Sequence, residues 1–165
     1  DKLMNAYDNS IRYTDNFLAR IIHLLKQQQV DASMLYTSDH GEDIFDDGRH
    51  LFLHASPVPS YYQLHVPLLL WTSDSYREEY PGIEKAASMN RQKNISSSIS
   101  FFQTMMELAG IETPYRNDSL SVTSPLYTEK SRVYLNDHNE PHSLDDIGMR
   151  KEDFEMLKKR GIDAQ

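Results

Sequence analysis

The sequence contains no cysteine, which excludes disulfide bonds and zinc sites built from thiolates. It also lacks a long hydrophobic run: the longest, from Val66 to Trp71, is far shorter than the ~20 residues that span a bilayer. Its first residues show no signal-peptide pattern, so we expect no leader. Positive charge is scarce, with 17 Lys and Arg against 25 Asp and Glu, which argues against a nucleic-acid partner. At 165 residues the chain is long enough for one globular domain.

What the sequence does contain is an alternation of helical and strand patterns. Apolar residues recur with helical periodicity in three segments, and short apolar runs typical of strands lie between them. We expect helices over 3–29, 95–109 and 151–160, strands over 33–37, 64–71 and 132–136, a long loop over 39–63, and an extended surface connection over 112–131. This order predicts an α/β domain with a central sheet.

Asp39 and His40 follow directly after the first predicted strand. In a parallel α/β sheet, ligands bind beyond the carboxyl ends of the strands, where these two side chains can converge. A carboxylate oxygen with an imidazole nitrogen suits zinc or manganese, and such an ion can polarise a phosphoryl or sulfuryl oxygen. The pair alone is weak evidence, because most polar residues at strand ends form caps and turns. The long loop that follows adds weight, since loops of this length are commonly functional.

Other histidines in or beside this loop are also candidate site residues. On a helix, His50 and His54 would share one face, but Gly48 and Pro57 argue against a helix there. We therefore interpret His50 as an exposed loop residue. His65, at the start of the second predicted strand, could equally be a packed histidine with one hydrogen bond.

Several familiar catalytic patterns are absent. The sequence has no Gly-x-Ser-x-Gly elbow, no Walker loop and no Gly-x-Gly-x-x-Gly fingerprint. Ser38 beside Asp39 and His40 is not interpreted as a triad, because triad members are gathered by the fold and are seldom adjacent in sequence. His138 and His142 could bind metal, but a polar surface segment is the simpler interpretation.

Several sequence stretches, in their order along the chain, resemble one family. The stretches "YTSDHGED", "FLHASP" and "QLHVPLLLW" closely resemble the C-terminal half of the phosphoethanolamine transferases, which belong to the sulfatase and alkaline phosphatase superfamily. "NAYDNSIRYTDNFLARIIHLL" is similar to the helix before the strand, and "SISFFQTMMELAGIE" to the helix that follows. The resemblance is strongest over 5–112. It implies a three-layer alkaline-phosphatase/sulfatase-like α/β fold, of which 1–165 would be the C-terminal portion and 145–165 a tail with a short helix.

The resemblance also implies roles for individual residues. Asp39 and His40 match a zinc-binding pair, with zinc expected ahead of manganese or calcium. His54 matches a histidine beside the phosphate or a second zinc, so it is the expected catalytic residue, and His54 and His65 are expected to bind substrate. The family's threonine nucleophile and a further acidic metal ligand match no residue of this chain. We therefore expect the chain alone to be inactive.

The function that the resemblance implies is metal-dependent transfer of phosphoethanolamine from a phospholipid to a glycolipid, lipid A or a core sugar, through a phospho-threonine. It also implies a protein anchored in the inner membrane, with its catalytic domain facing the periplasm. Two alternatives stay open: a sulfatase-like hydrolase or phosphoglycerol transferase with the same metal pair, and a non-catalytic binding domain. Ala55 replaces a usual glycine, and residues 43–46 replace a Ser-Leu-Gly-Glu type of sequence, which leaves the acceptor open.

Overall fold

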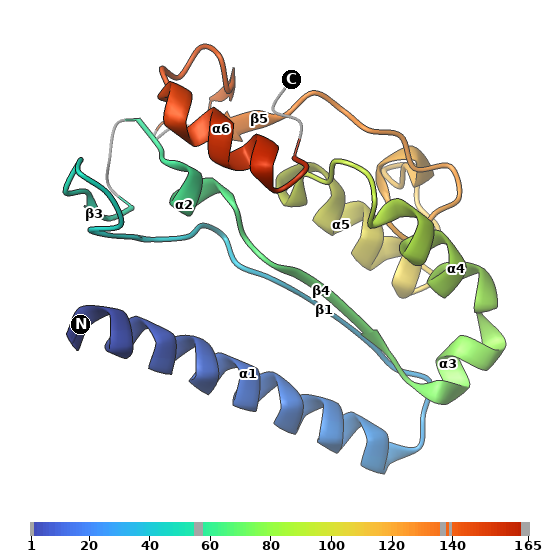
Figure 1. The fold of residues 1–165 in the computed structure, drawn as a ribbon. Coiled ribbons are helices and arrows are strands. Elements are labelled where there is room, and N and C mark those ends of the chain that lie inside the picture. The colour runs from blue at the N-terminus through green and yellow to red at the C-terminus, as the bar shows by residue number, and fades with distance from the viewer. Residues whose placement is uncertain (1, 55–57, 136–137, 139, 163–165) are drawn as a thin grey trace.

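The computed structural model describes residues 2–54, 58–135, 138 and 140–162 (Figure 1). Its elements are α1 (Lys2–Gln28), β1 (Ser33–Thr37), β2 (Asp43–Ile44), β3 (Phe52–Leu53), α2 (Tyr61–Leu64), β4 (Leu68–Thr72), α3 (Asp74–Glu79), α4 (Pro81–Asn90), α5 (Ser97–Leu108), the 3-10 helix η1 (Asp118–Leu120), β5 (Val133–Leu135), β6 (Pro141–Ser143) and α6 (Lys151–Lys159). The three predicted helices are confirmed as α1, α5 and α6, and the first predicted strand as β1. Within the described ranges, no helix combines the length and apolar character needed to cross a bilayer.

β1 and β4 form an antiparallel ribbon, in which Ser33 lies opposite Thr72 and Thr37 opposite Leu68. Figure 1 shows this ribbon between α1 on one side and α5 on the other, so helices and strands form layers. The layering agrees with the predicted α/β class. The strands of the described part pair only in antiparallel ladders.

α1 is amphipathic, yet none of its described side chains is fully buried. Ile11, Phe17 and Leu24 are each more than half exposed. The helix ends at Gln28, and Gln29 then adopts a left-handed φ of 53° that turns the chain into β1. An apolar helix face is therefore left uncovered by the rest of the described chain.

The segment predicted as one long loop, 39–63, is partly regular. β2 and β3 form a small antiparallel hairpin, with Asp43 opposite Leu53 and Ile44 opposite Phe52. Each strand has only two residues, which is too short for any period-2 pattern to show in the sequence. The hairpin folds the histidine-rich stretch back toward the end of β1 (Figure 1).

Three short helices also lie outside the sequence prediction. Ser60 and Ser73 cap α2 and α3, since their side chains accept hydrogen bonds from backbone N–H groups three residues on. Pro81 starts α4, a position where its missing N–H costs nothing. Because α2 extends to Leu64, the second strand begins at Leu68 rather than at residue 64.

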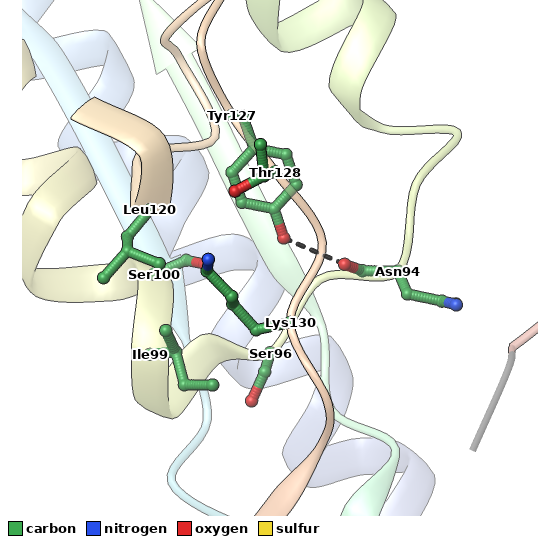
Figure 2. Close-up of a pocket in the computed structure, with 8 residues that line it drawn as sticks. All are labelled: Asn94, Ser96, Ile99, Ser100, Leu120, Tyr127, Thr128 and Lys130. Atoms are coloured by element: carbon green, nitrogen blue, oxygen red, sulfur yellow. Dashed lines mark hydrogen bonds between the residues drawn. The ribbon is translucent and has the colours of Figure 1, made fainter. Parts of the chain in front are cut away.

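The segment 112–131, predicted as an extended surface connection, instead packs against α5. Ser121, Thr123 and Ser124 are almost fully buried. Figure 2 shows a shallow hollow beside the first turn of α5, where the Tyr127 hydroxyl donates to the carbonyl oxygen of Asn94 at 2.8 Å. Neither carboxylates nor histidines line this hollow, so it lacks metal-binding chemistry.

The C-terminal part of the chain contributes a buried apolar cluster. Tyr61 of α2 packs there with Leu144, Met149 and Leu157. β5 and β6 pair only with each other, so the strand predicted over 132–136 does not join the central ribbon; its last residue lies outside the described residues. The short helix expected in 145–165 is α6, which packs against α2.

Candidate functional site

The turn after β1 is fixed by short-range hydrogen bonds. The Ser38 hydroxyl donates to the carbonyl oxygen of His40 at 2.7 Å, and the Asp39 carboxylate accepts from the His40 N–H at 3.0 Å. Both bonds are local side chain-to-backbone contacts of the kind that Ser and Asp favour in turns. The turn places Asp39 and His40 side by side at the end of the ribbon, as predicted.

α2 supports this segment from behind. The Gly41 N–H donates to the carbonyl oxygen of Gln63 at 2.8 Å, and a Cβ at position 41 would overlap the backbone carbonyl of Tyr62. Asp43 is buried and accepts hydrogen bonds from the Ser60 hydroxyl at 2.7 Å and from the side-chain amide of Gln63. The residues on both sides of position 42 are therefore anchored to α2.

His40 keeps one ring nitrogen suited to a metal. Its Nδ1 lies 3.0 Å from the carbonyl oxygen of Gly41, which can only accept, so Nδ1 carries a proton and Nε2 is the nitrogen that could bind a metal. A backbone carbonyl at the outer nitrogen is a common partner of metal-binding histidines. Oδ2 of Asp39 lies 3.6 Å from Nε2 of His40, close to the separation of about 3.3 Å between two ligands of tetrahedral zinc. The pair therefore fits one ion.

His54 and Glu42 are brought together by the hairpin. They flank the paired residues Asp43 and Leu53, and the Glu42 carboxylate accepts a hydrogen bond from Nδ1 of His54, with distances of 2.9 and 3.1 Å to its two oxygens. The rings of His54 and His40 lie against each other, with centroids 3.9 Å apart. With Nδ1 engaged, Nε2 is the His54 nitrogen left to contact a ligand.

His40, Glu42 and His54 together form a group of possible metal ligands, since one ligand atom of each lies within 4.8 Å of the others. Imidazole nitrogen and carboxylate oxygen are zinc ligands, so the donor set suits that metal. Sequence reasoning did not single out Glu42. The signal was present in the Asp-His-Gly-Glu run itself, where the carboxylate follows His40 by two residues.

Local interactions also set the protonation of nearby groups. The hydrogen bond from the His40 N–H holds the pKa of Asp39 below its ordinary value, so this exposed side chain stays ionised and can bind a cation. On α1, burial raises the pKa of Tyr7, and the negative charges of Glu42 and Asp46 raise it further. The first turns of α1 therefore lie within the field of the acidic hairpin.

The other predicted histidines lie apart from this group. His50 is exposed in the hairpin turn, with a left-handed φ of 56°. His65 is exposed, and its Nδ1 is hydrogen-bonded to the hydroxyl of Tyr61 at 2.7 Å, so it has the single hydrogen bond expected of a packed histidine without the burial. Its role in substrate binding stays a prediction. His142 lies opposite Tyr134 in the β5–β6 hairpin. The Ala55 substitution lies outside the described residues.

Comparisons with known proteins decide the family. The family model described as Sulfatase matches residues 1–111. The chain belongs to the sulfatase family. It is 33% identical to phosphoethanolamine transferase EptA of Salmonella typhimurium over 130 residues, which cover 76% of this chain and 23% of that relative. The family that the sequence motifs predicted is thus confirmed.

Solved structures confirm the fold. The C-terminal periplasmic domain of phosphoethanolamine transferase EptC from Campylobacter jejuni matches with a TM-score of 0.65 and 27% identity, covering 77% of this chain and 39% of that one. A zinc complex of the C-terminal periplasmic domain of EcEptC from Escherichia coli matches with a TM-score of 0.61 and 23% identity, covering 86% of this chain and 39% of that one. The chain spans about a quarter of the length of the curated relatives it matches.

Proposed function

We propose that this chain forms part of the active site of a zinc-dependent phosphoethanolamine transferase, which moves phosphoethanolamine from a phospholipid to a glycolipid such as lipid A. The observation that carries the proposal is the pairing of His40 with Asp39 and of His54 with Glu42 in a chain whose relatives are named phosphoethanolamine transferases. The complete protein would be anchored in the inner membrane with this part in the periplasm, because the similar EptC domains are periplasmic.

Asp39 and His40 would hold the zinc ion through Oδ2 and Nε2. Zinc bound there would polarise a phosphoryl oxygen and offset its negative charge. Two protein ligands are fewer than zinc sites usually have. The threonine nucleophile and the further acidic ligand that the family resemblance implies would complete the site, and neither is assigned to a residue of this chain. The chain alone is therefore proposed to be inactive and to bind zinc weakly.

His54 would contact the transferring phosphoryl group. The Glu42 carboxylate fixes the His54 ring through Nδ1, so Nε2 is left for the substrate. A protonated Nε2 donates to a phosphoryl oxygen, and the neighbouring carboxylate stabilises the imidazolium charge. A donor held in this way stabilises the charge that develops during transfer, without having to reorganise at that moment.

The test of the metal assignment is Asp39→Ala in the complete protein. Zinc content and transfer of phosphoethanolamine to lipid A should both fall sharply. Asp74→Ala is the matched control, because Asp74 is an equally exposed acidic residue on α3 whose ion pair is with Arg77. Full zinc content and full activity in Asp39→Ala would overturn the assignment. Release of the group to water, with no transfer to lipid A, would favour the hydrolase alternative.

A further inference from the structure

Arg49 and Asp153 are 104 residues apart in sequence but form a bidentate ion pair. Nη1 of Arg49 donates to Oδ2 of Asp153 at 2.6 Å, and Nη2 donates to Oδ1 at 2.9 Å. The side chains are 9% and 1% exposed, so water screens the pair little. A fork of two parallel bonds also fixes the relative orientation of the two groups. The hairpin loop is thereby attached to α6.

The Asp153 carboxylate has a third partner, which links α6 to α2. Its Oδ1 accepts the backbone N–H of Tyr61, the first residue of α2, at 2.9 Å. A buried carboxylate is stable only when its charge is paired and its oxygens are hydrogen-bonded, and these three bonds meet that requirement. One side chain of α6 therefore connects the hairpin loop, α2 and α6.

Arg49 also organises the hairpin loop itself. Its Nε donates to both carboxylate oxygens of Asp47, at 3.0 and 2.8 Å, and its backbone N–H donates to the same carboxylate at 2.9 Å. These bonds raise the pKa of Arg49 above its ordinary value, Asp47 contributing most and Asp153 next. Phe45 and His50, on either side, have left-handed φ values of 64° and 56°, which are unfavourable for residues other than glycine. Such a loop needs external contacts to hold one conformation.

The hairpin depends on contacts of this kind because its ladder is short. Two residue pairs do not make a stable hairpin in water. At its base, Asp43 is anchored to Ser60 and Gln63. At its loop, the equivalent anchor is the bond from Arg49 to Asp153. The paired residues that bring Glu42 and His54 together begin at the first anchor and lead into the loop that holds the second.

We propose that Arg49 and Asp153 are positioning residues for His54: through them, α6 holds the hairpin in the register that pairs His54 with Glu42. The inference rests on the proposed function, since it assigns α6 a part in building that site. The C-terminal helix is then required for turnover although it lies outside the segment with the family motifs. Loss of the pair should displace His54 more than it displaces Asp39 or His40, which are fixed by the turn after β1.

The experiment compares Arg49→Lys with Arg77→Lys in the complete protein. Lysine keeps the charge opposite Asp153 but loses the fork, so the variant should fold. Arg77→Lys is the matched control, because it alters an ion pair with Asp74 on α3. Arg49→Lys should lower kcat/KM about 10-fold, the lower end of the range for groups that orient active-site ligands. Hydrogen exchange of the amides in 42–54 should also become faster, whereas Arg77→Lys should change neither quantity.

The decisive comparison repeats Arg49→Lys in a His54→Ala background. If Arg49 acts through His54, the substitution costs nothing further in kcat/KM there, because coupled residues are not additive. An undiminished loss in that background, or unchanged exchange in 42–54, would overturn the proposal. If the complete protein shows no transferase activity, the proposed function fails, and hydrogen exchange alone decides: faster exchange supports the positioning role and unchanged exchange excludes it.

Discussion

The Glu42 carboxylate accepts a hydrogen bond from Nδ1 of His54 at 2.9 Å, whereas Nδ1 of the adjacent His40 is bonded to the neutral carbonyl oxygen of Gly41. Because the two rings have different partners at Nδ1, they are suited to different chemistry. A carboxylate stabilises positive charge on an imidazole, which suits a donor to phosphate. The backbone carbonyl at Nδ1 of His40 fixes the tautomer in which Nε2 faces Oδ2 of Asp39, 3.6 Å away, which suits a metal ligand. We therefore propose different roles for these two rings, whose centroids are 3.9 Å apart.

The substitution Glu42→Gln tests this division. It keeps the size of the side chain and one acceptor oxygen but removes the negative charge beside Nδ1 of His54. We expect kcat to fall about 10–100-fold while the zinc content is unchanged, because the proposed function places the metal on Asp39 and His40. Steady-state kinetics and elemental analysis of the complete protein provide the measurement. Glu84→Gln, at an exposed position on α4, serves as control. Loss of zinc in Glu42→Gln would show that His40, Glu42 and His54 bind one ion together.

The substitution His54→Ala should separate catalysis from stability. Half of the His54 side chain is exposed, so little packing depends on it. Removing one donor aimed at developing charge typically lowers the rate about 10²–10³-fold. Turnover should fall by this factor while the thermal melting temperature changes little. A large drop in melting temperature with a proportionate loss of activity would make His54 structural, and normal activity would remove it from the site.

The parts of the fold that the sequence predicts are those with a local pattern. The helical periodicity of 3–29 and the apolar run of 33–37 specify α1 and β1, because each element contains enough residues to show its own period. α3 and α4 were not predicted, although the sequence contains residues typical of helix starts at both. Ser73 caps α3, and Pro81 begins α4, as such residues commonly do at helix starts.

The candidate site likewise contains contacts that the sequence predicts and contacts that it does not. Asp39 and His40 are predictable because they adjoin one strand end, and the contact between them is local. The contact of Glu42 with His54 depends on the register of a hairpin with two-residue strands, which no periodicity reveals. The bond from Arg49 to Asp153 crosses most of the chain, so no local signal could predict it.

Gly41 should be the least replaceable glycine of the chain. A Cβ at position 41 would overlap the Tyr62 carbonyl oxygen, which is backbone and cannot move without displacing α2. We expect Gly41→Ala to lower the free energy of unfolding by about 1–3 kcal/mol, as overpacking usually does, and to reduce activity further by displacing His40. Urea unfolding of the complete protein measures the first effect. Gly48→Ala is the control, because a Cβ there meets no atom within 4 Å. Equal stabilities of the two variants would contradict the close packing of Gly41 against α2.

His65 should make the fold sensitive to acid. Burial, and then the positive charges of Arg160 and Arg132, lower its pKa below the ordinary value of 6.5. The unfolded chain therefore binds this proton more readily than the folded chain. The stability that neutral His65 provides is complete above about pH 6.5 and is lost as the pH falls through the lower, folded-state pKa. In protonated His65, Nδ1 could only donate to the Tyr61 hydroxyl oxygen.

The variant His65→Gln should reduce this acid sensitivity, because its amide oxygen can still accept from Tyr61 but does not titrate. Between about pH 7.5 and about pH 5, its free energy of unfolding should fall less than that of the wild type. Urea unfolding at both pH values measures the difference. His23→Gln, at an exposed position on α1, should retain the full wild-type loss. If His65→Gln loses as much stability as the wild type, protonation of His65 is not coupled to unfolding, and its contact with Tyr61 does not depend on the neutral ring.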